Sequence, residues 1–323
     1  MVIPWYIMKL GPATPEYFEE HKFFGLKKGN VFFFEQGTLP AFDMTGKILL
    51  EAKDKVSVAP DGNGGIYRAL RLSGVLGDMS KRGIKYLHAY CVDNCLVKVA
   101  DPAFIGYCAS KNVECGAKVV RKEDPKESVG VICLKNGKAA VVEYSEIDPK
   151  VAALTKPDGT LVYAAANIAN HYYTIEFLQR VQSFETALDY HVAKKKIKHV
   201  TIPAGNLITP TSNNGIKLEL FVFDVFPLLD LFKFAVLESA RSEDFSPLKN
   251  ATGPDSPETS RNDILALHRK WIEASGATVE KGVIVELSSV LTYGGEDLEA
   301  VKGKTVVKSG HADTLKELQK LLA

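Results

Sequence analysis

Short apolar runs alternate with stretches of helical periodicity from residue 1 to about residue 250. Val31 to Phe34 and Tyr86 to Val92 are mainly apolar and have the length of buried strands. From Thr174 to about Leu188 the apolar residues recur at helical spacing, which indicates a helix with one face on a sheet. This alternation predicts an α/β core built on a mixed, mostly parallel sheet.

Two apolar segments between Val129 and Tyr144 flank Asn136-Gly137, a dipeptide that favours a tight type I′ turn, so an antiparallel hairpin is expected there. The apolar run Ile3 to Met8 is predicted to be a buried strand. Such a strand needs neighbours on both sides, and we expect those on one side to come from preceding sequence.

The polar, proline-bearing stretch Leu248 to Thr259 is the best candidate for a boundary. A helix is expected to begin after it, with Ser256 as its cap and Gly276 at its end. Two strands and a last helix should follow, at Val283 to Leu287, Thr305 to Val307 and Leu315 to Leu322. The sequence thus predicts a core over residues 1–250 and a small α+β region over residues 251–323.

Composition limits the partners that the chain can attract and indicates the cellular compartment in which it is expected. The chain has 46% hydrophobic and 24% charged residues and a net charge of +1, so no overall field attracts nucleic acid or an anionic membrane. The first apolar run is too short to span a bilayer and has no basic segment before it. Five cysteines without a CxxC pair fit reduced thiols, and we expect a cytoplasmic protein.

A glycine-rich turn, Pro60 to Gly65, runs directly into a segment with helical character. Glycines let a backbone approach a ligand closely, and the N–H groups at the start of a helix can bind an anion. A plain surface turn has a similar composition, so both interpretations stay open.

Asp93 follows an apolar run, at a place where carboxylates face the ligand crevice of open α/β sheets. It could hold Mg²⁺ against phosphate oxygens, because this ion favours carboxylate and substrate oxygens. An aspartate here can also be a simple turn former.

Phe221 and Phe223 are expected on one face of a strand, either as core residues or as the wall of a sugar pocket. Lys249 lies in a proline-bearing segment from which it could reach a phosphate, or it is a solvated loop lysine. The basic run Lys194 to Lys198 is interpreted as a solvated face. No H-E-x-x-H, G-x-S-x-G or Walker-type motif occurs.

Taken together, these segments resemble the eukaryotic UDP-N-acetylglucosamine pyrophosphorylases, a branch of the UDP-sugar pyrophosphorylases. The resemblance covers nearly the whole chain, in order, at Ile3 to Met8, Phe24 to Lys28, Pro60 to Gly65, Tyr90 to Asn94, Val141 to Glu146, Asn167 to His171, Asn214 to Lys217 and Phe245 to Asn250. UDP-glucose enzymes usually carry a histidine in the place of Asn63, which favours an N-acetylhexosamine substrate over a UDP-glucose-type reaction.

The resemblance implies a Rossmann-like nucleotidyltransferase core and a role for each matching residue. Gln36 and Gly62 match groups that bind the nucleotide base. Asp93 matches the acid that places Mg²⁺, and Lys249 matches the lysine that neutralises the phosphates, so both are expected to be catalytic and to contact the nucleotide. The positions that match the sugar and N-acetyl site are Asn63, Gly130, Glu143, Asn167, Phe221 and Phe223.

The implied reaction joins UTP and N-acetylglucosamine 1-phosphate to give UDP-N-acetylglucosamine and pyrophosphate. Transfers of this kind need positioning and charge neutralisation rather than a protein nucleophile. Family members carry a glycine-rich phosphate loop ahead of the region matched here, and the sequence contains no such loop. We therefore expect an N-terminally truncated core, and a chain that binds UDP-sugar without turnover is the alternative. Preference between the glucosamine and galactosamine substrates and the oligomeric state stay open.

Overall fold

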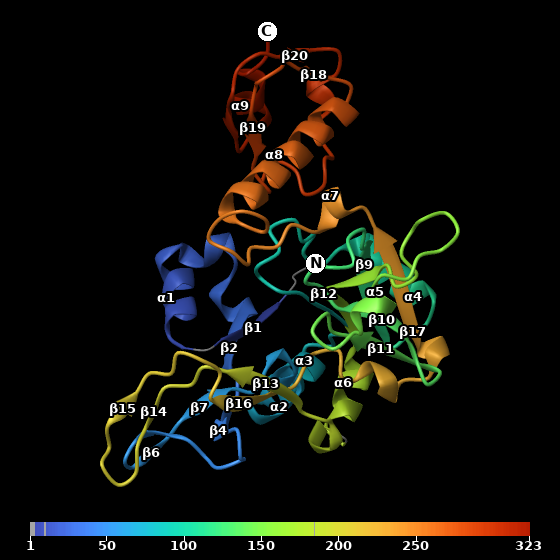
Figure 1. Ribbon diagram of the computed structural model, residues 1–323. Coiled ribbons are helices and arrows are strands. Elements are labelled where there is room, and N and C mark those ends of the chain that lie inside the picture. The colour runs from blue at the N-terminus through green and yellow to red at the C-terminus, as the bar shows by residue number, and fades with distance from the viewer. Residues whose placement is uncertain (1–3, 10, 184) are drawn as a thin grey trace. The chain divides into compact units, whose positions relative to one another are not determined.

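The computed structural model describes residues 4–9, 11–183 and 185–323 (Figure 1). The chain forms two compact units, and each is described by itself. Unit 1 comprises Met1–Leu87, Leu134–Val141 and Tyr173–Phe234, and unit 2 comprises His88–Cys133, Val142–Tyr172 and Ala235–Ala323. The sequence-based division at residue 250 stays a prediction.

The largest sheet has six strands in the order β11-β10-β12-β9-β17, and β8 also pairs with β12. Their bounds are β8 (Tyr86–Ala89), β9 (Cys115–Arg121), β10 (Val131–Lys135), β11 (Lys138–Val142), β12 (Ala165–Thr174) and β17 (Phe234–Ser239). Asn136 and Gly137 have φ of 53° and 75° and connect β10 to β11, as a type I′ turn requires. The expected α/β fold with a hairpin insertion is confirmed.

Small sheets and short helices make up most of unit 1. Strand β1 pairs with β2 in parallel, β16 lies between β13 and β4, and β3 pairs with β7. The bounds are β1 (Trp5–Lys9), β2 (Val31–Glu35), β3 (Thr38–Pro40), β4 (Phe42–Asp43), β5 (Leu50–Ala52), β6 (Lys55–Val56), β7 (Val58–Pro60), β13 (His191–Lys195), β14 (His199–Val200), β15 (Leu207–Ile208), β16 (Gly215–Glu219), α1 (Ala13–Glu20), α2 (Ile66–Leu72), α3 (Val75–Lys81) and α6 (Ile175–Val181).

The predicted first strand exists, but the prediction that it is buried is wrong. Trp5 to Met8 are only half-buried, because β2 is the single strand paired with β1 in the described part of the chain. Residues 1–3 of the apolar run lie outside the described residues. The helix expected from Thr174 to Leu188 is shorter than predicted, since α6 ends at Val181.

In unit 2, β9 is almost wholly buried and packs near α4 (Pro102–Ser110), while α5 (Pro149–Ala152) and α7 (Arg241–Asp244) are short. Asp101 caps α4 by accepting a hydrogen bond from the Ala103 N–H group. Phe104, Cys108 and Tyr172 form one core cluster beside β9.

The C-terminal part of unit 2, orange to red in Figure 1, has a hydrophobic core of its own. It contains α8 (Pro257–Ala274), β18 (Thr278–Val279), β19 (Val285–Leu287), β20 (Thr305–Val306), β21 (Gly310–Ala312) and α9 (Leu315–Gln319). Helix α8 begins and ends where the sequence predicts, and its Ile272 enters this core, with Trp271 packed against it. Helix α9 is shorter than expected and ends before Leu321.

Three candidate site residues lie in turns: Asp93, which was expected directly at the end of a strand, and Phe221 and Phe223, which were expected within one. Strand β8 ends at Ala89, so Asp93 occupies a turn beyond it, and Val92 is 95% exposed. Phe221 and Phe223 follow β16, which ends at Glu219. Apolar composition suggested strand in both places, but hydrogen bonds to neighbouring segments stabilise turns there instead.

We expect the substitution Ser256→Ala to lower the free energy of unfolding by about 1 kcal/mol. The reason is the capping box of α8, in which Ser256 and Thr259 satisfy each other's backbone N–H groups. Chemical denaturation measures the loss. Ser242→Ala is the control, because this exposed serine has no side-chain hydrogen bond with the described residues, and its effect should stay within about 0.5 kcal/mol. Equal effects of the two substitutions would contradict the capping role.

Candidate active site

The glycine-rich turn of unit 1 lies directly against the chain that follows β16. Gly64 donates a hydrogen bond from its N–H to the Leu220 carbonyl at 2.8 Å, and Leu220 donates to the Asp61 carbonyl at 2.8 Å. A Cβ on Gly62 would lie 2.2 Å from the Leu220 oxygen, and one on Gly64 would lie 2.7 Å from the backbone of Leu220 and Phe221. Glycine at both positions is therefore a condition of this contact between two backbone segments.

This contact brings the predicted base and sugar residues of unit 1 together. The Asn63 Oδ1 atom accepts a hydrogen bond from the Val222 N–H at 2.9 Å, and the Gln36 Nε2 atom donates to the Gly62 carbonyl at 2.5 Å. These backbone partners determine which end of each amide is used. Asn63 Nδ2 and Gln36 Oε1 have no hydrogen bond with the described residues, so one donor and one acceptor remain for a ligand.

Two aromatic rings follow in the turn after β16. The centroids of Phe221 and Phe223 are 5.2 Å apart, and Phe223 is 6% exposed whereas Phe221 is half-buried. Phe221 also packs against the His191 ring at 4.4 Å. Phe223 is thus mainly a core residue, and Phe221 is the one of the pair with a partly accessible face.

Side chains that sequence analysis did not single out support this turn. Asp224 accepts from the Phe221 N–H at 2.7 Å and contacts His191 Nε2 at 3.0 Å. The hydroxyl groups of Tyr67 and Tyr173 both donate to the Val222 carbonyl. Tyr67 and Tyr173 are 106 residues apart, and no local sequence pattern links them.

In unit 2, the structure brings Asp93 and Lys249 onto neighbouring antiparallel segments. Asn94 forms an isolated antiparallel bridge with Pro247, and the Leu248 N–H donates to the Asp93 carbonyl at 2.9 Å. Burial and, to a smaller extent, the Asp93 charge raise the pKa of the Cys91 thiol to about 11, while the Lys249 charge opposes the shift. Both charges therefore act on the same thiol.

The two side chains keep different surroundings. The exposed Lys249 ammonium donates to the Ser128 carbonyl at 3.3 Å and lies 6.0 Å from the Phe245 ring centroid. The half-buried Asp93 carboxylate has no hydrogen bond or ion pair with the described residues. Over the same residues no three His, Cys, Asp or Glu side chains gather as metal ligands. A single accessible carboxylate fits Mg²⁺ that is bound partly through substrate phosphates.

Asn167 in β12 is oriented by two protein donors. Its Oδ1 atom accepts from the Ala169 N–H at 3.2 Å and pairs with His171 Nε2 at 3.0 Å. Burial, together with the nearby His88, lowers the pKa of His171 to about 3, so the ring is neutral near pH 7 and Nε2–H is the donor. The Asn167 Nδ2 group, which has no bond with the described residues, is then available as a donor.

Gly130 is hydrogen-bonded to Asn167, and Glu143 acts electrostatically on the nearby Lys122. The Gly130 carbonyl accepts from the Asn167 N–H at 2.8 Å, and Glu143 directly follows β11. Lys122, which is 3% exposed, donates to the Glu127 carbonyl at 3.0 Å and so fixes the loop before Gly130. Burial lowers the pKa of Lys122, and surrounding carboxylates including Glu143 oppose that shift.

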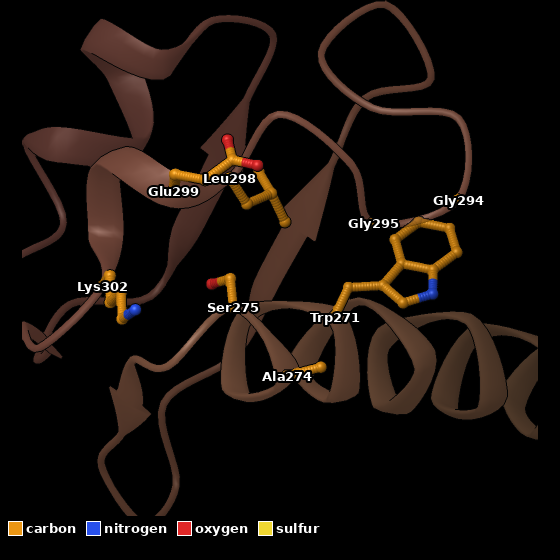
Figure 2. A pocket seen from close by; sticks show the side chains of 8 residues that line it. All are labelled: Trp271, Ala274, Ser275, Gly294, Gly295, Leu298, Glu299 and Lys302. Carbon is orange, nitrogen blue, oxygen red and sulfur yellow. The ribbon is translucent and has the colours of Figure 1, made fainter.

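Two pockets in unit 2 are not lined by any predicted site residue. One, of about 370 Å³, has the Trp271 ring on one side and Gly295, Glu299 and Lys302 around it (Figure 2). The other, of about 410 Å³, is lined by the Arg121–Glu238 ion pair and neighbouring residues, namely Arg121, Glu123, Glu238, Ser239, Ala240 and Arg241. Among the described residues no helix has the length and apolar character needed to cross a bilayer.

Comparison with known proteins defines the class. The family model described as UTP–glucose-1-phosphate uridylyltransferase matches residues 1–280. Curated relatives include a UDP-N-acetylglucosamine pyrophosphorylase of Saccharomyces cerevisiae, 50% identical over 95% of this chain, and a human UDP-N-acetylhexosamine pyrophosphorylase-like protein 1, 48% identical over 92%. The chain spans 66% and 63% of the length of these two relatives.

Solved structures indicate the same relationship to UDP-sugar pyrophosphorylases. An Entamoeba histolytica protein matches with a TM-score of 0.85 and 36% identity, over 97% of this chain and 77% of that one. The UDP-N-acetylglucosamine pyrophosphorylase of Trypanosoma brucei matches with a TM-score of 0.76 and 30% identity, over 91% of this chain and 63% of that one.

The chain belongs to the UTP–glucose-1-phosphate uridylyltransferase family, a class of nucleotidyltransferases with the α/β fold described above. Within that class, its resemblance to the UDP-N-acetylglucosamine pyrophosphorylases, inferred from the sequence, is confirmed by these relatives.

We expect Gly62→Ala to destabilise unit 1 by about 1 to 3 kcal/mol more than Gly46→Ala. Both glycines have φ near +85° (85° and 88°), but a Cβ would meet the Leu220 backbone only at Gly62, whereas Gly46 has nothing within 4 Å. The pair of variants thus compares a positive-φ glycine whose Cβ would clash with backbone and one whose Cβ would not. Denaturant unfolding of both proteins measures the difference. Equal losses would show that the close contact with Leu220 can relax.

Stability should fall as the pH drops from about 6.5 toward 3, in part through His171. Its folded pKa, about 3, is below the unfolded value, so in this window the unfolded chain binds a proton that the folded chain does not. The expected slope is about 1.4 kcal/mol per pH unit for this one group. The free energies of unfolding of the wild type and of His171→Gln, measured at pH 7.5 and 5.5, isolate the contribution of this histidine. If the variant keeps the full slope, the histidine is not the source.

Proposed function

We propose that this chain acts in a UDP-N-acetylhexosamine pyrophosphorylase reaction, in which UTP and N-acetylglucosamine 1-phosphate give UDP-N-acetylglucosamine and pyrophosphate. The observation that carries the proposal is the position of Asp93 and Lys249 on adjacent segments, since this reaction needs a metal-binding carboxylate and a cation for the phosphates. The names and identities of the relatives support the same activity.

The residues of unit 1 suit the neutral parts of such a ligand. Gln36 offers an acceptor and Gly62 a backbone for the edge of the uracil base. Asn63 offers its Nδ2 donor to the sugar, and the half-buried face of Phe221 offers an apolar surface to the N-acetyl methyl group, with Phe223 behind it.

The residues of unit 2 suit the hydroxyl groups and the phosphates. Asn167 would donate to a sugar oxygen, Glu143 would accept from a hydroxyl group, and the Gly130 backbone would line the same position. Asp93 would hold Mg²⁺, which supplies positive charge against the phosphate oxygens when it is bound. Lys249 would place its ammonium against the phosphates as negative charge moves to the leaving pyrophosphate.

The five thiols are free, which fits a reducing compartment, and the proposed location is the cytoplasm.

The decisive experiment measures pyrophosphate release by the purified chain with UTP, Mg²⁺ and, in parallel, the 1-phosphates of N-acetylglucosamine, N-acetylgalactosamine and glucose. The proposal expects turnover with an N-acetylhexosamine substrate. Binding of UDP-N-acetylglucosamine without turnover would replace it by the binding-only alternative, and a preference for glucose 1-phosphate would contradict the role of Asn63.

We expect Asp93→Asn and Lys249→Met each to lower kcat on the order of 10²-fold, because each removes a charge that is used most in the transition state. The fold should be kept, since neither side chain is buried. Steady-state kinetics with saturating UTP and Mg²⁺ measure the effect. The controls are Asp54→Asn and Lys196→Met, which remove the same charges at exposed positions. Unchanged rates in the two site variants would make both residues structural.

A further inference from the structure

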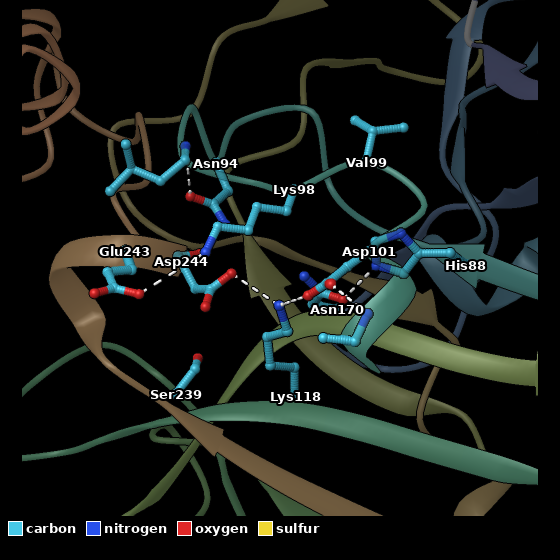
Figure 3. A network of polar contacts seen from close by, with 12 residues as sticks. His88, Asn94, Lys98, Val99, Asp101, Lys118, Asn170, Ser239, Glu243 and Asp244 are labelled. Atoms are coloured by element: carbon cyan, nitrogen blue, oxygen red, sulfur yellow. Dashed lines mark hydrogen bonds and ion pairs between the residues drawn. The ribbon is translucent and has the colours of Figure 1, made fainter. Parts of the chain in front are cut away.

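A lysine is completely enclosed in unit 2, between two carboxylates. Lys118 lies in β9 with a side chain that is 2% exposed, and its ammonium donates to Asp101 at 2.6 Å and to Asp244 at 2.8 Å (Figure 3). A buried ammonium is tolerated only when it is paired and hydrogen-bonded, so these contacts determine where both carboxylates lie.

Each carboxylate ends a segment that carries one of the proposed catalytic residues. Asp101 closes the irregular connection that contains Asp93, and its own oxygen caps α4. Burial raises the pKa of the Asp101 carboxyl, but the hydrogen bond and charge of Lys118 outweigh this and lower it. Asp244 ends α7, five residues before Lys249. The Lys118 ammonium thus contacts one carboxylate from each of the two segments.

A second set of bonds joins the same segments closer to the site. The Asn94 side chain donates from Nδ2 to the Asp244 carbonyl at 2.7 Å and accepts from the Ser246 N–H at 2.9 Å. Asn94 is 4% exposed and adjoins Asp93 in sequence. The chain of contacts therefore runs from Lys118 through Asp244 and Asn94 to the backbone of Asp93.

A histidine supports the Asp101 side of this network. His88 Nδ1 accepts from the Ala100 N–H at 3.0 Å, so Nε2 carries the proton and points to Asn170 Oδ1. Burial lowers the pKa of His88, which agrees with a neutral ring. Ala100 is held in place directly before Asp101.

We propose that Lys118 is a positioning residue, which holds the Asp93 and Lys249 segments at the separation needed for uridylyl transfer. Asp93 lies in a turn and Lys249 in a loop, so neither is held by a helix or a sheet ladder. A shift of about 1 Å in a reacting group can cost roughly 10²-fold in rate. The inference rests on the proposed function for its catalytic part, while the tether itself can be tested without turnover.

The test compares Lys118→Met with the neutral triple variant K118M/D101N/D244N, both in the full chain. Lys118→Met leaves two carboxylates without their cation and should destabilise the fold. The triple variant removes all three charges and should recover most of the melting temperature. We expect it still to show kcat reduced about 10-fold to 10²-fold, with KM for the sugar phosphate changed less than about 3-fold.

Hydrogen exchange supplies a readout that does not need the metal or turnover. In the triple variant, the amides of Ser246 and Leu248 should exchange at least about 10-fold faster than in the wild type, whereas those of β19 should not change. Leu318→Ala is the control, because it destabilises the separate C-terminal core of the same unit. At matched loss of stability it should keep kcat and the slow exchange of Ser246 and Leu248.

Fast exchange at these two amides with low kcat supports the positioning role. A triple variant with wild-type kcat and wild-type exchange would overturn it, because Lys118 would then act through stability alone. If the wild-type chain has no turnover, the proposed function fails, and the exchange rates still decide whether Lys118 holds the two segments together.

Discussion

The direct contact between the Gly62 to Gly65 turn and Leu220 is the constraint on which the candidate site of unit 1 depends. Two backbones can approach this closely only where no side chain lies between them, and Gly62 and Gly64 meet that condition. The hydrogen bonds of Gly64 and Leu220 then fix how the two segments are aligned with each other. The place of Asn63 beside Val222, and of Phe221 after Leu220, follows from this one contact.

In unit 2, side chains rather than glycines bring the two segments of the candidate site together. Asn94 bonds to the backbone of the segment that leads to Lys249, and Lys118 ties both segments to β9. A buried lysine is an expensive tether because its desolvation must be offset by nearby carboxylates. Hydrophobic residues of similar volume could stabilise the same space, but they would not specify where Asp101 and Asp244 lie. In the role proposed for Lys118, the ion pairs provide direction and distance in addition to stability.

The sequence was most informative where structure is local. Helix α8 with its cap at Ser256, the Asn136-Gly137 turn and the glycine-rich turn are each encoded within a few residues, and each was predicted correctly. The turns at Asp93 and Phe221 were mistaken for strands, because apolar composition does not show where a strand's partner ends.

The supporting side chains could not have been found in this way. Lys118 lies 126 residues from Asp244, and Tyr67 lies 155 residues from Val222, so no spacing in the sequence records either contact. Their burial is also concealed, since lysine and tyrosine are common at surfaces. The resemblance to the pyrophosphorylases identified the residues that would touch a ligand, whereas the groups that hold those residues became visible only in the fold.

The side-chain amides of the two candidate sugar-binding asparagines are oriented in the same way. Asn63 and Asn167 each have their Oδ1 atom occupied by protein N–H donors, which leaves the Nδ2 end to face a ligand. Such donors are uncharged, so their ability to bind a hydroxyl or carbonyl oxygen does not change with pH. For Asn167 this holds because His171 is buried and neutral and therefore donates one N–H at physiological pH. The charges of Asp93 and Lys249 suit phosphate chemistry, whereas the two amides suit a sugar through hydrogen bonds that do not depend on charge.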